Sequence, residues 1–337
     1  MENQTKNYAK AIAIGNQKGG VGKTTYTSCI AYVLAKMGYK VLCIDLDSQS
    51  SLSSLLNVFP SSFDLEEDPV YGIQDILEYV LECEDNHNEV QYSAIEHAIV
   101  RPQFKTAIRV KDGDDFKTDW KYEDFGFDLI PSDTSLANYN QLLPQRRNGG
   151  FAIYKVIKII KENSDYDFIL CDLAPSLDTV SYAGLAGCTE GIIIPINLEI
   201  MALRGTRNIV SAVAEIQRLM LQNNIKHNGI LGLLKSRYVK RYKIQQDFDE
   251  VVKDFFPIHI FSQDVPSSTN CDKAHAKGWL FAQYDKKIYA IFETIVKEVI
   301  DRTNELSNLK EPIIIESVGK EAENLLEMIN QEEDTNE

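Results

Sequence analysis

The 337-residue chain has no long hydrophobic run, and no two of its six cysteines lie at C-x-x-C spacing. No window approaches the roughly 18 consecutive apolar residues of a membrane span. The opening MENQTKNYAK also lacks the apolar core of a signal peptide. A cysteine zinc or redox site is therefore not expected. Cys43 and Cys171, inside apolar runs, are predicted to be buried in a reducing, cytoplasmic compartment.

Positive charge is scarce as well, because 35 Lys and Arg face 50 Asp and Glu and leave a formal net charge of -15. This balance taken alone argues against a nucleic-acid partner. The acids are concentrated, however. Residues 57–130 hold 18 acids and 6 basic residues, and residues 301–337 hold 11 and 3. The remainder of the chain is mildly basic.

Apolar runs that alternate with amphipathic segments dominate the rest of the sequence. Buried strands are predicted at 9–16, 40–47, 127–133, 167–176, 190–197, 228–238 and 256–262. Helices are predicted at 24–40, 73–81, 92–100, 150–163, 201–222 and 284–307, and residues 110–126 read as a loop or a small hairpin. This alternation predicts an α/β fold with a mostly parallel twisted sheet and helices on both faces.

The stretch GNQKGGVGKTTY, Gly15 to Tyr26, follows the first predicted strand and precedes the first predicted helix. It carries the G-K-[ST] end of the phosphate-loop pattern, although Gln17 stands where that pattern begins with glycine. Glycines let the backbone turn its N–H groups toward phosphate oxygens at the helix N-terminus. Lys23 would add a point charge at the β- and γ-phosphates, and the Thr24 hydroxyl a Mg²⁺ ligand. The loop predicts a site for ATP and Mg²⁺.

Three carboxylates follow predicted strands at the edge where nucleotides bind in parallel sheets. Asp172 has the character of a Walker-B acid that holds Mg²⁺ directly or through water. Asp45 and Asp47 alternate along an extended chain and so face one side; one could orient the attacking water and the other support the magnesium. A single strand-end Asp is as often a turn or a helix cap, but three beside a phosphate loop favour a catalytic site.

A second lysine, Lys18, lies five residues before Lys23. Its ammonium could fold back onto the phosphates of its own subunit, or project to a nucleotide held by a neighbouring subunit. The residues alone leave both possibilities open.

Four stretches, in order and spacing, resemble the deviant Walker-A ATPases of the ParA/Soj partition family, whose superfamily includes MinD-type ATPases and the nitrogenase iron protein. These are NQKGGVGKTT, VLCIDLDSQSSLSSLL, YDFILCDLAPSLD and EGIIIPINLEIMALRGT. The resemblance covers about residues 10–300. It departs from the usual family pattern in DLDSQS, which replaces DLDPQG, and in DLAPS, which replaces DCPPS.

The resemblance implies a role for each matched residue. Lys18 would reach the partner subunit's ATP in a face-to-face dimer, and Asp47 would position the hydrolytic water. Asp45 would be the companion acid and Asp172 the Walker-B acid, with Thr24 as a further magnesium ligand. The nucleotide site would comprise Lys18, Gly19, Gly20, Val21, Gly22, Lys23, Thr24 and Thr25, with Ser236, Arg237 and Pro266 as candidates for the adenine side.

Other branches of the superfamily fit the sequence less well. Cys83 and Cys188 do not lie where an iron–sulfur cluster would be bridged between subunits, and the C-terminal EAENLLEMINQEEDTNE is too acidic for an anionic membrane. The resemblance then implies an ATPase with slow intrinsic turnover for plasmid or chromosome partition. It would bind DNA nonspecifically as an ATP dimer on the nucleoid and meet a centromere-binding adaptor of ParB type. The alternative is an ATP switch that positions a protein complex without DNA.

A stretch without acids, Ile216 to Gln246, is the candidate DNA surface. The alternative is a solvated helix face. The chain is expected to comprise one ATPase domain, residues 1–307, with an acidic insert around 57–130, followed by an acidic extension, 308–337. The candidate DNA contacts are Lys235, Lys240, Arg241 and Lys243, extended by Lys273 and Lys277.

Overall fold

The computed structural model describes residues 8–60, 69–112, 115–146, 148–197, 200–238 and 259–313. Its centre is a seven-stranded sheet in the order β5-β2-β6-β1-β7-β8-β9, in which every neighbouring pair is parallel. The predicted α/β class with a parallel sheet is confirmed. The strands are β1 (Lys10–Ile14), β2 (Val41–Leu46), β5 (Asp128–Ile130), β6 (Phe168–Leu173), β7 (Gly191–Asn197), β8 (Ile230–Tyr238) and β9 (Val265–Pro266).

The central strands are buried along their whole length, which is why they read as continuous apolar runs rather than as alternating ones. Cys43 and Cys171 are fully buried in β2 and β6, as predicted. The register places Asp45 of β2 directly beside Asp172 of β6. Because parallel strands end at the same edge, two carboxylates that are far apart in sequence meet there.

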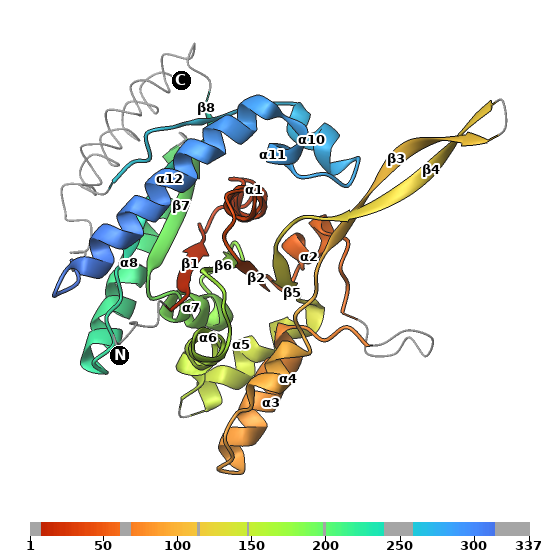
Figure 1. Cartoon of the computed structure of the whole chain (residues 1–337). Helices are drawn as coiled ribbons and strands as arrows, with labels where there is room; N and C mark the ends of the chain where they lie inside the picture. Colours follow the sequence, from red (N-terminus) through yellow and green to blue (C-terminus); the bar gives the residue numbers. More distant parts are fainter. Residues whose placement is uncertain are drawn as a thin grey trace, which may run out of the picture.

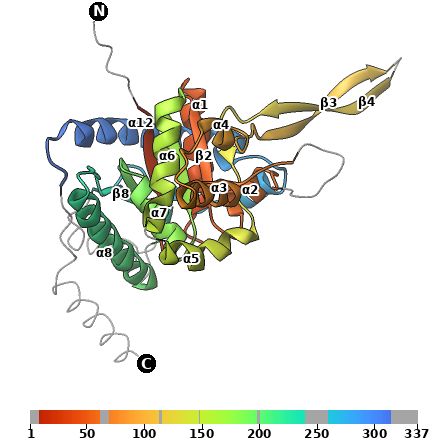
Figure 2. The ribbon, with the colours of Figure 1, turned by 90° about the horizontal axis from the view of Figure 1, so that it is seen from below.

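Helices cover both faces of the sheet (Figures 1 and 2). One face packs against α1 (Lys23–Lys36), α2 (Ser51–Leu55), α11 (Phe281–Tyr284) and α12 (Lys286–Asn308). The other face packs against α3 (Ile73–Asp85), α4 (Tyr92–Glu96), α5 (Tyr139–Leu142), α6 (Ala152–Asn163), α7 (Thr179–Gly187) and α8 (Ile200–Gln222). The short helix α10 (Asn270–His275) lies beyond β9, and 3₁₀ turns occupy 134–138, 143–145 and 149–151.

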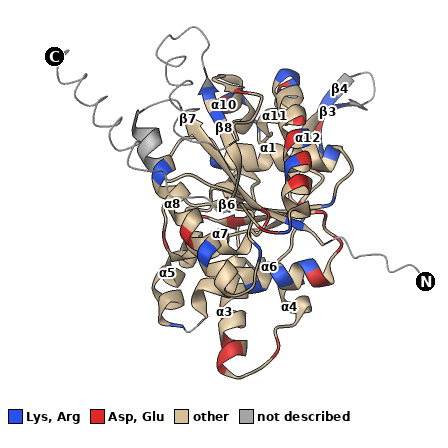
Figure 3. Ribbon diagram, turned by 90° about the vertical axis from the view of Figure 1, so that its left-hand side faces the viewer, with Lys and Arg blue, Asp and Glu red and all other residues tan. Residues whose placement is uncertain are grey.

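The acidic segment 57–130 is not a separate unit. Helix α3 contributes to the core on one face of the sheet, and β5 is the sheet's edge strand. Figure 3 shows that the acidic residues of α3 gather at its far end, away from the sheet. The predicted helix over 92–100 is shorter than expected, because α4 ends at Glu96 and Val100 then pairs antiparallel with Leu129 of β5.

Residues 110–126, expected to be a loop or a small hairpin, belong to a long β-hairpin. Strands β3 (Gln103–Asp112) and β4 (Asp115–Asp124) pair over their whole length and project from the body as an arm (Figures 1 and 2). The strand predicted at 256–262 appears in the described residues only as a bridge between Ile260 and Leu233. Among the described residues, no helix combines the length and apolarity needed to cross a bilayer.

Candidate functional site

The loop between β1 and α1 makes a tight turn at the carboxyl edge of the sheet. Gly20 and Gly22 have φ angles of 74° and 94°, in the region that favours glycine. Helix α1 begins directly afterwards at Lys23, with no side-chain cap on Gly22 and no acid in its first turn. The N–H groups of that first turn are therefore available to an anion, and the helix dipole favours one there.

Gly22 is constrained a second time by packing. A Cβ at this position would lie 2.9 Å from Cζ of Tyr26, whereas a Cβ at Gly19 would meet nothing within 4 Å. We expect Gly22→Ala to lower the free energy of unfolding by about 1–3 kcal/mol, because it adds strain at positive φ to a steric clash. Gly19→Ala, as the control, should change it by under about 1 kcal/mol. Urea denaturation measures both, and equal effects would contradict the geometry.

Hydrogen bonds from distant elements hold the loop. The hydroxyl of Tyr26 donates to Oγ of Ser236 at 2.7 Å, and that Oγ donates to the carbonyl of Val21 at 2.7 Å. Nδ2 of Asn16 donates to the carbonyl of Pro195 at 2.6 Å, while its Oδ1 accepts from the N–H of Lys18 at 3.2 Å. Ser236, a candidate for the adenine side, is thus buried as a brace for the loop. Asn16 and Tyr26 lie within the quoted stretch Gly15 to Tyr26, whereas only the fold reveals the bracing role of Ser236.

The two lysines have different surroundings. Lys23 is only 8% exposed, and its ammonium donates to the carbonyl of Lys18 at 3.3 Å. Burial lowers the pKa of Lys23, while the nearby Asp172 and Asp47 oppose that shift. Lys18 lies at the rim of the loop and is partly exposed. The positive charge needed to neutralise phosphates is therefore concentrated at the mouth of the turn.

Asp172 is fully buried at the end of β6 and receives two hydroxyls from the first turns of α1. Thr24 Oγ1 donates to its Oδ2 at 2.7 Å, and Thr27 Oγ1 donates to its Oδ1 at 2.8 Å. Burial raises its pKa to about 7, and the adjacent Asp45 adds to that shift. Thr27 was not predicted from the sequence. The signal for it is the i, i+3 spacing from Thr24, which places both hydroxyls on one helix face.

Asp45 is also fully buried, and its pKa is raised to about 6, chiefly by burial. Its Oδ2 accepts from the N–H and the Oγ of Ser53 at 2.8 and 2.7 Å, and its Oδ1 accepts from the N–H of Asp47 at 3.1 Å. These hydrogen bonds fix the turn that leads to Asp47. The prediction of Asp45 as a metal residue stays a prediction.

Asp47 is 6% exposed and held by the turn that follows it. Its Oδ1 accepts from the N–H of Gln49 at 2.9 Å, and its Oδ2 accepts from Oγ of Ser51 at 3.1 Å. Its own carbonyl accepts from Oγ of Ser132 at 2.7 Å. Each carboxylate oxygen keeps capacity for one more donor, so this side chain can orient a water molecule.

The donor set suits Mg²⁺. The Thr24 hydroxyl and the Asp172 carboxylate are hard oxygen ligands beside each other at the mouth of the loop. Mg²⁺ is typically bound by one or two carboxylates together with substrate phosphates and waters. This agrees with the described residues, in which no group of three or more His, Cys, Asp or Glu could hold a metal alone. A divalent cation bound there would stabilise the ionised carboxylate of Asp172 and so oppose the effect of burial on its pKa.

The raised pKa of Asp172 predicts how stability depends on pH. As pH rises from about 4 to about 7, an unfolded Asp releases its proton first, so the native state loses stability. Asp172→Asn removes this titration. In EDTA without nucleotide, its stability relative to the natural chain should therefore rise between pH 5 and pH 8, by roughly 1–3 kcal/mol. Urea denaturation is the measurement, with exposed Asp119→Asn as control; a pH-independent difference would contradict the assignment.

A cavity of about 260 Å³ adjoins the loop on its outer side. Arg237 and Pro266, the two candidates for the adenine side, line it together with Gly22 and Thr25 of the loop. Arg237 is exposed and has a φ of 53°, where β8 ends. The two residues come from different strands and meet because β8 and β9 are paired. Their placement beside the phosphate cradle suits a nucleoside.

Three of the six candidate DNA contacts fall on residues that the structure describes. Lys235 is buried and its ammonium pairs with Asp264 at 2.8 Å, so it is not a surface contact for DNA as predicted. Lys273 on α10 and Lys277 just after it are exposed, and the ammonium of Lys277 lies 5.0 Å from the Tyr284 ring centroid. The remaining candidates, Lys240, Arg241 and Lys243, lie outside the described residues.

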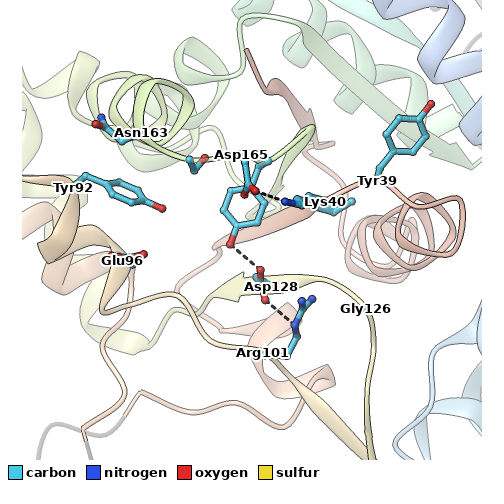
Figure 4. A pocket seen from close by; sticks show the side chains of 12 residues that line it. Tyr39, Lys40, Tyr92, Glu96, Arg101, Gly126, Asp128, Asn163 and Asp165 are labelled. Atoms are coloured by element: carbon cyan, nitrogen blue, oxygen red, sulfur yellow. Dashed lines mark hydrogen bonds and ion pairs between the residues drawn. The ribbon is translucent and has the colours of Figure 1, made fainter. Parts of the chain in front are cut away.

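A larger cavity of about 630 Å³ lies at the opposite, amino edge of the sheet (Figure 4). Here Asp128, the first residue of β5, accepts from the hydroxyl of Tyr166 at 2.8 Å and pairs with Nε of Arg101 at 3.1 Å. Lys40, just before β2, pairs with Asp165. The cavity is distant from the phosphate loop, and the ion pair of Arg101 with Asp128 ties the segment leading into β3 to the sheet.

Comparisons with known proteins agree with this geometry. The chain matches the family described as AAA domain over residues 9–227. The uncharacterized protein MJECL24 of Methanocaldococcus jannaschii is 29% identical over 81% of this chain and 91% of its own length. The chromosome partitioning protein ParA of Caulobacter vibrioides is 24% identical over 88% of this chain and 96% of its own length.

Solved structures show the same fold. Cobyrinic acid a,c-diamide synthase from Mycobacterium smegmatis, with bound ADP and magnesium, has a TM-score of 0.63 and 23% identity, covering 90% of this chain and 98% of that one. Apo McdA from Cyanothece has a TM-score of 0.62 and 20% identity, covering 88% and 99%. The motifs, the sheet that positions them and the match over residues 9–227 show that the chain belongs to the AAA domain family, as a phosphate-loop ATPase of the ParA and MinD type.

Proposed function

We propose that this protein hydrolyses ATP slowly as an ATP-dependent homodimer and uses that cycle to partition DNA, a plasmid or a chromosome. The observation that carries the proposal is the arrangement around α1. Uncapped N–H groups, two lysines and three buried carboxylates converge on one turn at the carboxyl edge of the sheet. The resemblance of the whole chain to a chromosome partitioning protein supports the biological role.

The residues divide the chemistry between them. The loop and Lys23 bind the triphosphate, and Lys18 closes the site from the partner subunit. Asp47, oriented by the N–H of Gln49 and the hydroxyl of Ser51, aligns the attacking water. Thr24 and Asp172 would hold Mg²⁺, which when bound neutralises charge on the phosphates. Arg237 and Pro266 line the place for the adenine.

A basic adaptor fits the acidic side of the molecule. Glu78 and Glu82 of α3 line a cavity of about 520 Å³ together with Tyr71 and Tyr79. Carboxylates beside aromatic rings suit lysine and arginine side chains. We propose that an adaptor of ParB type stimulates hydrolysis and docks through a basic segment, and that the ATP dimer resides on the nucleoid in the cytoplasm rather than on a membrane.

The test is retention of plasmid DNA with ATP, with ADP and without nucleotide. ATP-dependent retention that weakens steeply with salt supports the proposal. The second candidate is an ATP switch that positions a protein complex, favoured by the overall charge of -15. Dimerisation with ATP and no DNA retention at any salt concentration would establish that candidate and overturn the partition role.

A further inference from the structure

The β3–β4 arm has one face whose chemistry the nucleotide site does not explain. Opposed residues of an antiparallel pair share a face and alternate along each strand. The register pairs Lys105 with Tyr122, Ala107 with Trp120 and Arg109 with Thr118. These residues, with Lys111, form what is here termed the aromatic face of the arm. Its described residues between Lys105 and Tyr122 include three cations and no acid.

The side chains of the aromatic face are turned to solvent. Trp120 is 53% exposed and Tyr122 is 65% exposed, although large rings usually gain from burial. The ammonium of Lys105 lies 5.1 Å from the centroid of the Trp120 ring. The cations and rings are therefore interleaved on one surface.

The other face of the arm has a different character. From the pair Phe104 and Glu123 to the pair Val110 and Lys117, it carries Lys117 and Lys121 together with Asp119 and Glu123, and Lys121 pairs with Glu123 at 2.8 Å. The register places Asp112 and Asp115 on the same face, nearer the tip. The charges of that part of the face balance, whereas the aromatic face keeps an excess of cations even when Asp124 at its root, opposite Gln103, is counted. The two faces of the arm therefore differ in charge. The composition of residues 57–130, which are acidic as a whole, does not show this difference.

The root of the arm is anchored and its outer part extends from the body (Figures 1 and 2). At the root, the ring of Phe104 packs against Phe125 and Trp279, with centroids 4.9 and 6.1 Å away. Arg101 adds its ion pair with Asp128 of β5, shown in Figure 4. Phe104 belongs to the other face, so at the root that face is turned toward the body and the aromatic face away from it. An isolated two-stranded ribbon is only marginally stable in water, and a bound partner would stabilise it.

We infer that the aromatic face of the β3–β4 arm binds duplex DNA, with the ribbon lying along a groove. The inference deepens the proposed function by naming a DNA-contacting element. Lys105, Arg109 and Lys111 supply charge for phosphates, and charge complementarity selects a polyanion. A two-stranded ribbon has the dimensions of the major groove. Trp120 and Tyr122 add apolar contact with sugars and base edges. The other face disfavours the reverse orientation.

The experiment compares two double variants of the full chain that remove the same number of cations from opposite faces. Lys105→Ala with Arg109→Ala changes the aromatic face, and Lys117→Ala with Lys121→Ala changes the other. With ATP and a 40-base-pair duplex, the first pair should weaken binding at least about tenfold. It should also flatten the plot of log affinity against log salt by about 2. The second pair should weaken binding less than about threefold.

A spectroscopic readout reports contact directly. In Trp279→Phe, Trp120 is the remaining tryptophan of this chain, which has two. Its emission should change on adding the duplex with ATP and stay constant with ADP. ATP-dependent dimerisation, measured beside it, should be the same in all of these variants, because the arm lies away from the nucleotide site.

Each outcome separates the two proposals. If the unaltered chain retains no DNA, the partition function itself fails. If it retains DNA and the two double variants bind equally, the arm inference fails and another surface, such as the basic segment at 240–243, binds the DNA. Anionic vesicles of phosphatidylglycerol and phosphatidylcholine form the last arm of the test. Loss of vesicle binding without loss of DNA binding in the aromatic-face variant would overturn the inference in favour of a lipid surface.

Discussion

Replacing Asp47 by Ala is expected to lower the rate of ATP hydrolysis by about 10²- to 10³-fold while ATP binding persists. General acid–base and water-positioning groups typically contribute 10²–10⁴ to a rate. Asp47 is suited to this task because two donors from its own turn fix the carboxylate beside the phosphate loop. Without it, the triphosphate and both lysines remain, so the ATP dimer should form and persist.

Single-turnover hydrolysis and size-exclusion chromatography with ATP measure the two effects separately. Ser51→Ala is a useful companion, because it removes one orienting hydroxyl and keeps the carboxylate; its rate should fall by less than about tenfold. An Asp47→Ala protein that stays monomeric at saturating ATP while retaining its native thermal transition would show that the side chain acts in assembly and not in hydrolysis.

The second large effect is expected at Lys18. Lys18→Ala should weaken ATP-dependent dimerisation by roughly 30- to 1,000-fold, since truncating one member of a buried charged pair at an interface costs about 2–4 kcal/mol. Binding of ATP to the monomer should change little, because Lys23 and the N–H groups at the start of α1 hold the phosphates within one subunit. The predicted result is a monomer that binds ATP.

Analytical ultracentrifugation with a slowly hydrolysed ATP analogue tests this directly. Lys36→Ala serves as the matched control, because that lysine ends α1 far from the loop and its ammonium lies 5.2 Å from the Tyr32 ring centroid. The control should dimerise normally. Intact dimerisation of Lys18→Ala, or a loss of ATP affinity equal to its loss of dimerisation, would place Lys18 on the phosphates of its own subunit.

The glycine-rich turn between β1 and α1 could be predicted because its determinants are local. The glycine loop, Lys23 and Thr24 lie within ten residues between a strand and a helix, and the period of the flanking apolar residues identifies both elements. The position of Asp172 at the same edge of the sheet could be predicted for a related reason. Once β1, β2 and β6 are parallel neighbours, their carboxyl ends must meet.

Other features depend on contacts between distant segments. Ser236 and Lys235 read as ligand candidates, yet Ser236 braces Val21 and Lys235 neutralises Asp264. Asp45 is predicted as a metal residue, and the structure adds that Ser53 and the N–H of Asp47 donate to its oxygens. Ser236 and Lys235 can each serve ligand binding or packing, and partners far along the chain decide which; the partners of Asp45 lie within eight residues of it.

The sequence by itself determined the parallel α/β class, the phosphate cradle and the carboxylates around it, because these depend on short-range spacing and on apolar runs buried on both sides. Only the tertiary structure showed which charged side chains stay exposed, which residues hold the loop and which residues share a face of the arm. The physical reason is that a strand's alternation acquires meaning only through register. Pairing β3 with β4 gathers three cations and two aromatic rings on one face and leaves most of the acids on the other.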